Sequence, residues 1–158
     1  MFKFITISLL LCLSLSSLSA REINLNALAT DAAKQNKHLL VWLHKTDCGY
    51  CESMREFTLE DEKVAAVLKK SYLFSHINIS ENDEIIYKTF KGNGKAFAKK
   101  VGYNFYPSSL FLNEKADLIF AAAGYIEEKD FLIMLEYVDS GAYRRMKYDL
   151  FRQQKGRR

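Results

Sequence analysis

The sequence contains little proline and glycine: one proline and seven glycines in 158 residues. This excludes collagen-like and low-complexity chains, which need far more of both residues. The chain also has no apolar run of the roughly 20 residues that a membrane-spanning helix requires. Hydrophobic residues make up 49% of the chain and charged residues 27%, with a formal net charge of only +4. These proportions are typical of one globular domain.

The first twenty residues differ from the rest. Lys3 is their only charge, an apolar run extends from residue 4 to 13, and Ala20 is a small residue at the end. A short charged start, a short apolar centre and a small final residue predict a cleavable secretory signal over residues 1–20. We therefore expect an exported, periplasmic protein whose remaining 158 − 20 = 138 residues have a net charge of 22 − 19 = +3.

Three cysteines are present, and one of them, Cys12, lies in the predicted signal. The other two, Cys48 and Cys51, are separated by only two residues, so a bridge between them closes too short a loop to stabilise the fold much. A structural disulfide and a metal site are alternatives to a reactive dithiol. A closed zinc site needs four ligands, however, and the chain has only three histidines to add. A copper-binding module using Cys48, Cys51 and Met54 is the main rival, because soft sulfur ligands select Cu(I).

The cysteine pair lies between a predicted strand and a predicted helix. Residues 38–44 include a continuous apolar run, which is typical of a central strand covered on both faces. The segment Cys48-Gly49-Tyr50-Cys51 follows this strand, and residues 52–57 are compatible with a helix. A strand that leads through a cysteine pair into a helix is one expected context for a redox motif.

The remaining periodicities predict further helices and strands. Residues 80–95 are polar around a short apolar piece and are interpreted as an insertion or lid within the domain of residues 21–143. The resulting order of elements predicts an α/β fold with a central mixed β-sheet flanked by helices on both faces. The expected helices cover residues 25–37, 62–70, 96–101 and 126–138, and the expected strands cover residues 72–79, 108–112 and 118–122.

Taken together, the apolar strand, the Cys-Gly-Tyr-Cys motif, the single Pro107 before a hairpin and the closing helix resemble the thioredoxin fold. Over residues 24 to 140 the pattern resembles exported bacterial thioredoxin-like proteins. These include the C-terminal domain of the transmembrane thiol-electron transporter and the thioredoxins associated with sulfur oxidation. The resemblance implies a thiol-disulfide oxidoreductase whose redox-active group is the Cys48–Cys51 disulfide, with no other cofactor and no metal.

The two cysteines are expected to have different roles. Cys48 lies at the helix N-terminus, where the backbone amides favour an anion, so it is the predicted nucleophile. The helix end contributes about 0.3–1 kcal/mol and at most ~2, which corresponds to roughly one pKa unit. Cys51 is one turn further into the helix and is the predicted resolving cysteine. The resemblance implies that Gly49, Tyr50, Tyr106 and a cis Pro107 contact the substrate.

Several positions depart from the family pattern. Trp42 occupies the place of a buried acid, Asp47 the place of a tryptophan, and Glu56 the place of a proline. Proton transfer at Cys51 must then use water or a weak candidate such as Asp47, Glu52 or His44. Because no histidine lies between the cysteines, a reductase or isomerase is expected rather than a strong oxidant. The expected partners are protein clients and a protein that regenerates the dithiol; we expect a monomer and no nucleic-acid partner.

The basic character of the chain is concentrated at its C-terminus. Residues 144–158 contain seven Lys or Arg and one acid, a net +6, so residues 21–143 sum to −3. Apolar residues alternate with these charges at helical spacing, which predicts a basic C-terminal helix or tail. One interpretation is a helical extension with its apolar side against the domain. The alternative is weak docking onto an anionic membrane surface or an acidic partner.

Overall fold

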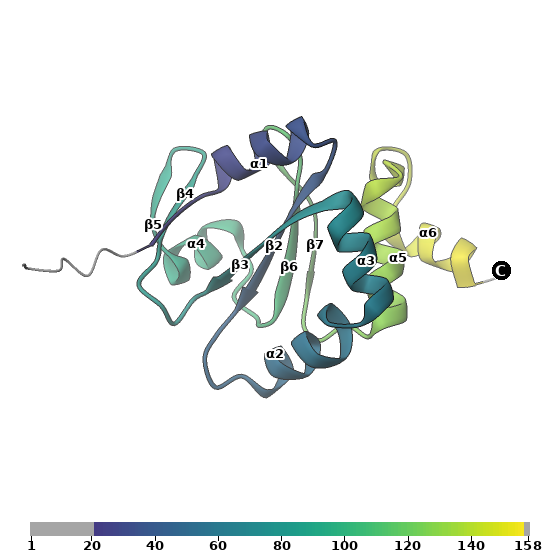
Figure 1. Cartoon of the computed structure of the whole chain (residues 1–158), viewed down its shortest axis with the longest axis horizontal. Helices are drawn as coiled ribbons and strands as arrows, with labels where there is room; N and C mark the ends of the chain where they lie inside the picture. The colour runs from purple at the N-terminus through teal and green to yellow at the C-terminus, as the bar shows by residue number, and fades with distance from the viewer. Residues whose placement is uncertain (1–20, 157–158) are drawn as a thin grey trace, which may run out of the picture.

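The computed structural model describes residues 21–156, so the predicted signal segment and Cys12 lie outside the described residues. A four-stranded sheet is surrounded by helices, and a smaller sheet lies at one side (Figure 1). In chain order the elements are β1 (Glu22–Asn24), α1 (Leu25–Lys34), β2 (His38–His44), α2 (Gly49–Met54), the π-helical segment η1 (Arg55–Leu59), α3 (Glu62–Ser71), β3 (Tyr72–Asn78), β4 (Glu84–Tyr87), β5 (Phe90–Asn93), α4 (Gly94–Val101), β6 (Ser108–Leu112), β7 (Leu118–Ala123), α5 (Glu128–Asp139), the 3-10 segment η2 (Ala142–Arg144) and α6 (Tyr148–Gly156).

The large sheet has the strand order β3-β2-β6-β7. Strands β2 and β3 are parallel, and β2–β6 and β6–β7 are antiparallel. The parallel pair is joined by the helical crossover of α2, η1 and α3, whereas β6 and β7 form a hairpin. The predicted α/β class with a mixed sheet is therefore confirmed.

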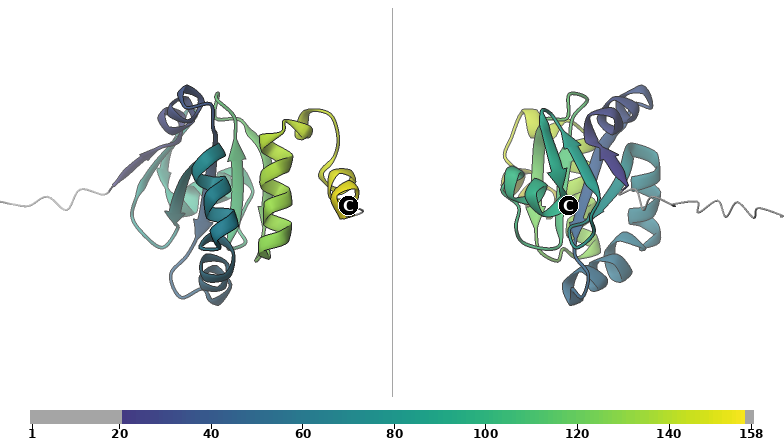
Figure 2. Two further views of the ribbon diagram at one scale, coloured as in Figure 1. Left: turned by 45° about the vertical axis from the view of Figure 1, so that its right-hand side comes forward. Right: turned by 90° about the vertical axis from the view of Figure 1, so that its left-hand side faces the viewer.

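Alternation along β2 divides the core into two faces. Leu39, Val41 and Leu43 pack with α1 and α4, and we call this side the α1/α4 face. Leu40 packs with α3 and α5 on the other side, the α3/α5 face. Successive strand residues point to opposite faces of a sheet, so a strand with apolar residues at every position must be covered on both. Helices lie on both sides of the sheet, as predicted (Figure 2).

Residues 80–95, interpreted from the sequence as an insertion or lid, pack against the body of the domain. Strands β4 and β5 pair with each other, and β4 also pairs in parallel with β1, giving a sheet of order β1-β4-β5. Ile85 is fully buried in the core of the α1/α4 face. Asn93 ends β5 and caps α4, since its side chain accepts a hydrogen bond from the Ala96 amide. A Cβ atom at Gly94 would lie 3.2 Å from Ile79 Cα, so this close approach requires glycine.

The end of α1 differs from the prediction made from the sequence, whereas the start of α3 agrees with it. Helix α1 ends at Lys34 rather than at residue 37, and Asn36 beyond it adopts a left-handed conformation with φ of 55°. Helix α3 begins after Asp61, whose carboxylate accepts hydrogen bonds from the amides of Lys63 and Val64. The Asp61 side chain thus satisfies amides that otherwise have no partner within the helix.

The C-terminal basic segment forms α6, which lies outside α5 (Figure 2). Phe151 is buried against the α3/α5 face, while Leu150 is exposed. Arg152 forms an ion pair with Asp130 at 2.8 Å, and Lys155 forms one with Glu136. The helix thus extends the domain with its apolar side inward. Across residues 21–156, no helix has both the length and the apolar character needed to cross a membrane.

Candidate active site

Cys48 and Cys51 form a disulfide at the start of α2, with an S–S distance of 2.10 Å. Cys48 is the N-cap of the helix, and its Sγ accepts a hydrogen bond from the Cys51 amide at 3.2 Å. The side chain of Cys48 is 8% exposed and that of Cys51 is 1% exposed. Both cysteines are buried, but Cys48 keeps some exposure and its sulfur is within reach of a helix amide, whereas Cys51 is enclosed.

The loop that places Cys48 is held by the neighbouring strand. Asp47 has φ of 54°, a left-handed conformation that Asp adopts more readily than most residues, and it turns the chain from β2 into α2. The Thr46 hydroxyl accepts a hydrogen bond from the Asn78 side-chain amide at 3.1 Å, and the Thr46 backbone amide donates to Ser80 Oγ at 3.2 Å. The end of β3 therefore fixes the loop that leads to the disulfide.

A second segment meets the disulfide from the start of β6. The Tyr106–Pro107 peptide bond is cis, and the Tyr106 carbonyl oxygen lies 4.0 Å from Cys48 Sγ although the two residues are 58 positions apart. Pro107 is buried, and its carbonyl oxygen accepts a hydrogen bond from the Gly124 amide at 2.7 Å. The structure thus brings Tyr106 and Pro107 to the cysteine pair.

The disulfide lies on an apolar base. Trp42 is buried and packs in one cluster with both cysteines, and Leu59 and Tyr106 pack against this cluster. The indole Nε1 of Trp42 has no hydrogen-bond partner among the residues that the structure describes. Trp42 replaces the buried acid of the family pattern with an apolar ring, so the base of the site contains no carboxylate at this position.

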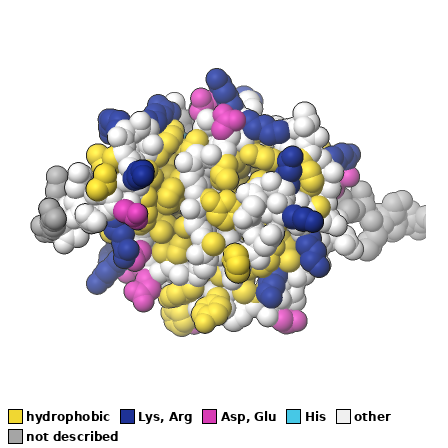
Figure 3. Space-filling model, turned by 180° about the vertical axis from the view of Figure 1, so that it is seen from behind, with side chains coloured by type: hydrophobic (Ala, Val, Ile, Leu, Met, Phe, Trp, Pro, Cys, Tyr) yellow, Lys and Arg dark blue, Asp and Glu magenta, His cyan; other side chains and the backbone are white. Residues whose placement is uncertain are grey.

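Exposed aromatic side chains lie at the surface near the cysteines. Tyr50 is 72% exposed and lies between them in the sequence, next to the exposed Gly49. Phe105, which immediately precedes Tyr106, is 76% exposed; the sequence analysis missed it. The signal that could have revealed it is its position beside the residue that contacts Cys48. Seen from behind, hydrophobic side chains extend to the lower edge of the molecule, the end at which α2 lies (Figure 3).

The charged and titratable groups near the site have defined partners. Glu52 forms an ion pair with Arg55 at 2.9 Å, and Arg55 also pairs with Glu60 at 2.5 Å. Burial, followed by the nearby His76, lowers the pKa of His44. Burial also raises the pKa of the Tyr106 hydroxyl. Glu52, one of the weak candidates for proton transfer, is therefore held by a guanidinium, and His44 favours its neutral form.

The helix after the cysteines is irregular despite its lack of proline. Six α-helical residues are followed by the π-helical turn η1, and such turns often occur near functional sites. Thr58 in η1 is fully buried, and its hydroxyl donates to the Ile126 carbonyl oxygen at 2.6 Å. Met54 is fully buried in the core of the α3/α5 face and lies outside the cluster that contains the cysteines. Within residues 21–156, no group of three or more His, Cys, Asp or Glu side chains could hold a metal ion.

Comparison with known proteins agrees with this architecture. Residues 25–139 match the model of a family described as a thioredoxin-like domain. A thioredoxin-fold protein from Helicobacter pylori is similar in structure, with a TM-score of 0.61 and 19% identity, covering 83% of this chain and 88% of that one. A thioredoxin from Thermus thermophilus is similar with a TM-score of 0.58 and 21% identity. The match covers 77% of this chain and 88% of that thioredoxin.

The oxidised C-terminal domain of DsbD from Neisseria meningitidis is also similar, with a TM-score of 0.52 and 16% identity, covering 72% of this chain and 89% of that domain. At these levels of identity the solved structures show a shared fold. No curated protein sequence matches the chain significantly.

Proposed function

The chain belongs to the thioredoxin-like domain family, and from this premise we propose that it is an exported enzyme that exchanges disulfides with protein clients. At the level of the family, a thioredoxin-like domain with a Cys-x-x-Cys pair supports a thiol-disulfide oxidoreductase. The finer assignments are the roles of the individual residues, the direction of electron flow and the location of the protein.

One observation is central to the proposal: a disulfide at a helix N-terminus whose outer sulfur borders the surface. Cys48 accepts the Cys51 amide hydrogen bond, and in the reduced protein the same amide would stabilise a Cys48 thiolate. Because the thiolate is the nucleophilic form of cysteine, we assign attack on clients to Cys48. The enclosed Cys51 is suited to resolve the mixed disulfide, since a client disulfide cannot easily reach it.

The proposed reaction of the reduced enzyme proceeds in two exchanges. The Cys48 thiolate attacks one sulfur of a client disulfide, forming a mixed disulfide and releasing the first client thiolate. The Cys51 thiolate then attacks Cys48 Sγ, which forms the Cys48–Cys51 disulfide and releases the second client thiolate. Two electrons pass from the enzyme to the client, and the Cys51 proton passes to solvent or to a released client thiolate. A second dithiol protein must then reduce the enzyme for another cycle.

The surface around Cys48 supports contact with an extended client segment. We assign this contact to Gly49 and Tyr50 on the cysteine loop and to Tyr106 and Pro107 on the facing loop. The Tyr106 carbonyl oxygen lies near Cys48, and Tyr106 itself lies in a loop before β6 rather than in a strand. The backbone of Tyr106 is therefore suited to pair with the backbone of a client. The exposed ring of Tyr50 adds apolar area beside the reacting sulfur.

We propose a reducing or isomerising role rather than strong oxidation. Strong oxidants of this chemistry stabilise the thiolate far more than a helix end does, with nucleophile pKa values of about 3.5 rather than about 7. Between the cysteines this chain has only Gly49 and Tyr50, which supply no cation. The residue before Cys48 is Asp47, whose negative charge opposes a thiolate.

Export and the periplasmic location are proposed from the N-terminal sequence pattern. In an oxidising compartment, a single reactive cysteine pair stays reduced only if a partner protein reduces its disulfide again. The proposed location therefore requires such a partner. The proposed partners are protein thiols and disulfides together with that regenerating protein. We propose that the protein is a monomer. As an exported protein it would not have nucleic acid as a partner. The basic helix α6 would make a weak contact with an anionic membrane.

A protein-disulfide reduction assay tests the proposed activity. With dithiothreitol as the electron source and insulin as the client, the full chain is expected to accelerate reduction, and Cys48→Ser is expected to reduce the rate to the uncatalysed level. Met54→Leu is the matched control, because it removes a buried sulfur outside the cysteine cluster and should leave the rate unchanged. Equal rates for wild type and Cys48→Ser would contradict the proposal.

A thiolate titration tests the proposed direction. Absorbance of the reduced protein should report a Cys48 thiolate that forms near neutral pH, as the helix end alone would produce. A thiolate that persists below about pH 5 would place the protein with the strong oxidants and contradict the reducing role.

A further inference from the structure

We propose that His44 and His76 form a binding site for a divalent transition metal ion that prefers imidazole, with Cu²⁺ bound more tightly than Zn²⁺. The proposal rests on the distance between the two rings, the cavity onto which they open and the charges around them. It does not depend on the thiol chemistry, because neither cysteine is among the ligands.

The two rings are placed side by side by the pairing of β2 with β3. In this parallel pair Trp42 is opposite His76, and His44 is opposite Asn78, so the two histidines are diagonal neighbours. His44 Nε2 and His76 Nδ1 are 3.2 Å apart, and the ring centroids are 5.4 Å apart with an interplanar angle of 38°. One nitrogen of each ring is therefore directed at the other ring.

This separation is the one that a shared metal ion requires. Two imidazole nitrogens, each about 2.0–2.1 Å from a zinc ion and 3.2 Å from one another, subtend about 100° at the metal, close to the tetrahedral angle. In the structure the nitrogens share a hydrogen bond along the line that joins them, so each ring must turn by about 40° about its soft terminal torsion to direct its lone pair at one ion. Metal binding thus replaces the one proton that the two rings share.

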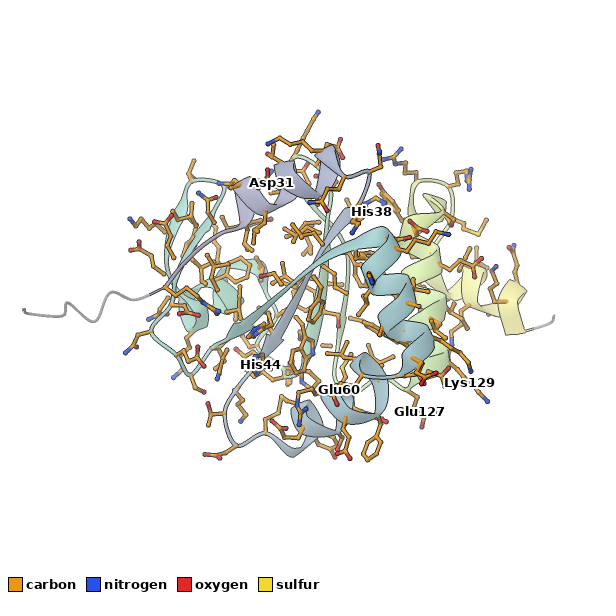
Figure 4. All side chains as sticks on the ribbon, in the orientation of Figure 1. Asp31, His38, His44, Glu60, Glu127 and Lys129 are labelled. Carbon is orange, nitrogen blue, oxygen red and sulfur yellow. A yellow bond between two sulfur atoms is a disulfide. The ribbon has the colours of Figure 1, made fainter. Side chains whose placement is uncertain are left out.

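The pair is accessible and lies among negative charges. Both rings line an open cavity of about 320 Å³ beside the π-helical turn η1. The carboxylates of Glu81 and Glu52 act on His44, and Glu60 lines the same cavity. Arg55 is the cation of this cavity, and its charge is already paired with Glu52 and Glu60. Figure 4 shows His44 and Glu60 at the end of the molecule near α2, and His38 at the opposite end of β2.

The donor set indicates the class of ion. Imidazole nitrogens suit Zn²⁺, Cu²⁺ and Ni²⁺, and the Irving–Williams order places Cu²⁺ first among them. Only two protein ligands are on hand, since the residues described contain no cluster of three donors. The remaining coordination positions are left to water or to a ligand from outside the chain. The site is therefore expected to exchange its ion readily rather than to hold a permanent structural metal.

Trp42 provides a built-in reporter. It is the only tryptophan in the chain, and its ring stacks on His44 with centroids 4.5 Å apart and an interplanar angle of 16°. Cu²⁺ bound to His44 would therefore lie close to the single indole and quench its fluorescence. Because Trp42 also packs against the disulfide, the ion would lie near the redox pair without contacting it.

The test is a titration of the full, untagged chain with its disulfide intact, using CuCl₂ with Trp42 fluorescence and ZnCl₂ with calorimetry. One ion per chain is expected. Loss of an outer-shell partner alone costs a metal site about 10- to 100-fold in affinity, so His44→Gln and His76→Gln should each weaken binding by at least about tenfold. His76 is exposed, so its variant is expected to fold; circular dichroism checks both variants.

Two matched controls separate this site from the others in the chain. His38→Gln removes the histidine at the far end of β2 and should leave affinity unchanged. A Cys48→Ser/Cys51→Ser double variant should also retain binding. Unchanged affinity in a folded His76→Gln variant would overturn the proposal. Loss of binding in the cysteine double variant would also overturn it and would assign the ion to the sulfurs.

Discussion

The two faces of the central sheet are built from different kinds of residue and contribute differently to stability and to the active site. The α1/α4 face is mostly aliphatic, and the small sheet closes it: Ile23 of β1 and Ile85 of β4 are part of its core. The α3/α5 face is rich in aromatic residues, and several of its buried hydroxyl groups bond to backbone carbonyls. Tyr72 donates to the Leu135 carbonyl oxygen at 2.6 Å, and Tyr137 donates to that of Met146 at 2.6 Å.

On β2, the α3/α5 side leads to the active site, and Tyr106 connects the site to the core of the α1/α4 face. On the α3/α5 side of β2 the positions after Leu40 are Trp42 and His44, which lie beside the disulfide and the cavity, respectively. Strand β2 thus contributes core residues to the α1/α4 face, and both core and active-site residues to the α3/α5 face.

On the α3/α5 face the buried hydroxyl groups of Thr58, Tyr72 and Tyr137 donate to backbone carbonyls, while Trp42 Nε1 has no partner among the described residues. The α1/α4 face is stabilised mainly by buried apolar area. We therefore expect substitutions on the α1/α4 face to change stability alone, and substitutions on the α3/α5 face to change activity as well.

The largest effect is expected at the cysteines. Cys51→Ala should trap mixed disulfides between Cys48 and client proteins, while Cys48→Ala should trap few or none, because attack and resolution are assigned to different sulfurs. Non-reducing gel electrophoresis of acid-quenched protein measures the trapped fraction. Equal trapping by the two variants would remove the distinction between the outer and the enclosed sulfur.

On the α1/α4 face the expected effect is on stability alone. Phe97 is fully buried and contacts Tyr87 and Phe90, so Phe97→Ala leaves a large cavity and should lower the free energy of unfolding by about 3–5 kcal/mol. Denaturant unfolding measures the loss. Insulin reduction per folded molecule should stay at the wild-type rate. A large loss of activity in the folded fraction would show that this face also shapes the site.

A smaller effect is expected where the α3/α5 face holds the active-site helix. Thr58→Val removes the hydroxyl that donates to Ile126 and leaves a buried carbonyl without this partner, so it should cost about 1–3 kcal/mol. Thr58→Ser keeps the hydroxyl and is the matched control. The comparison needs both unfolding curves and reduction rates, because movement of η1 should also slow reduction. If valine and serine behave alike, this hydrogen bond contributes nothing measurable.

The smallest effect concerns pH. Burial is the main cause that lowers the pKa of His38 below 6.5; Arg144 acts in the same direction, and Asp139 and Glu114 oppose it. With a lowered folded pKa, the unfolded chain binds the proton more readily, so stability is full above about pH 6.5 and declines as the pH falls below it. His38→Gln should therefore lose less unfolding free energy than wild type between about pH 7 and pH 5. Parallel pH profiles would show that His38 does not contribute.

Much of the fold and part of the site were predictable from local patterns. The apolar run of β2, the cysteine motif after it and the helix that follows are read from neighbouring residues, because period and capping depend on sequence distances of a few positions. Asp61 as a cap and Gly102 as the left-handed end of α4 follow from the same short-range chemistry. The strands β4 and β5 within residues 80–95 were not predicted, because a polar hairpin whose buried side is at Ile85 has only a weak pattern of its own.

Sequence alone determined the order of the strands and helices of the large sheet, the reactive pair and its place at a helix start, because each depends on adjacent residues. Tertiary structure decided which distant segments meet. Strand β1 pairs with β4 and not with the large sheet, the Tyr106 carbonyl meets Cys48 across 58 positions, and His44 meets His76 across 32. Such contacts depend on strand register and on packing of the whole core, and a one-residue change of register would direct each side chain to the opposite face. Their physical cause is therefore the cooperative burial of both faces, which no local pattern contains.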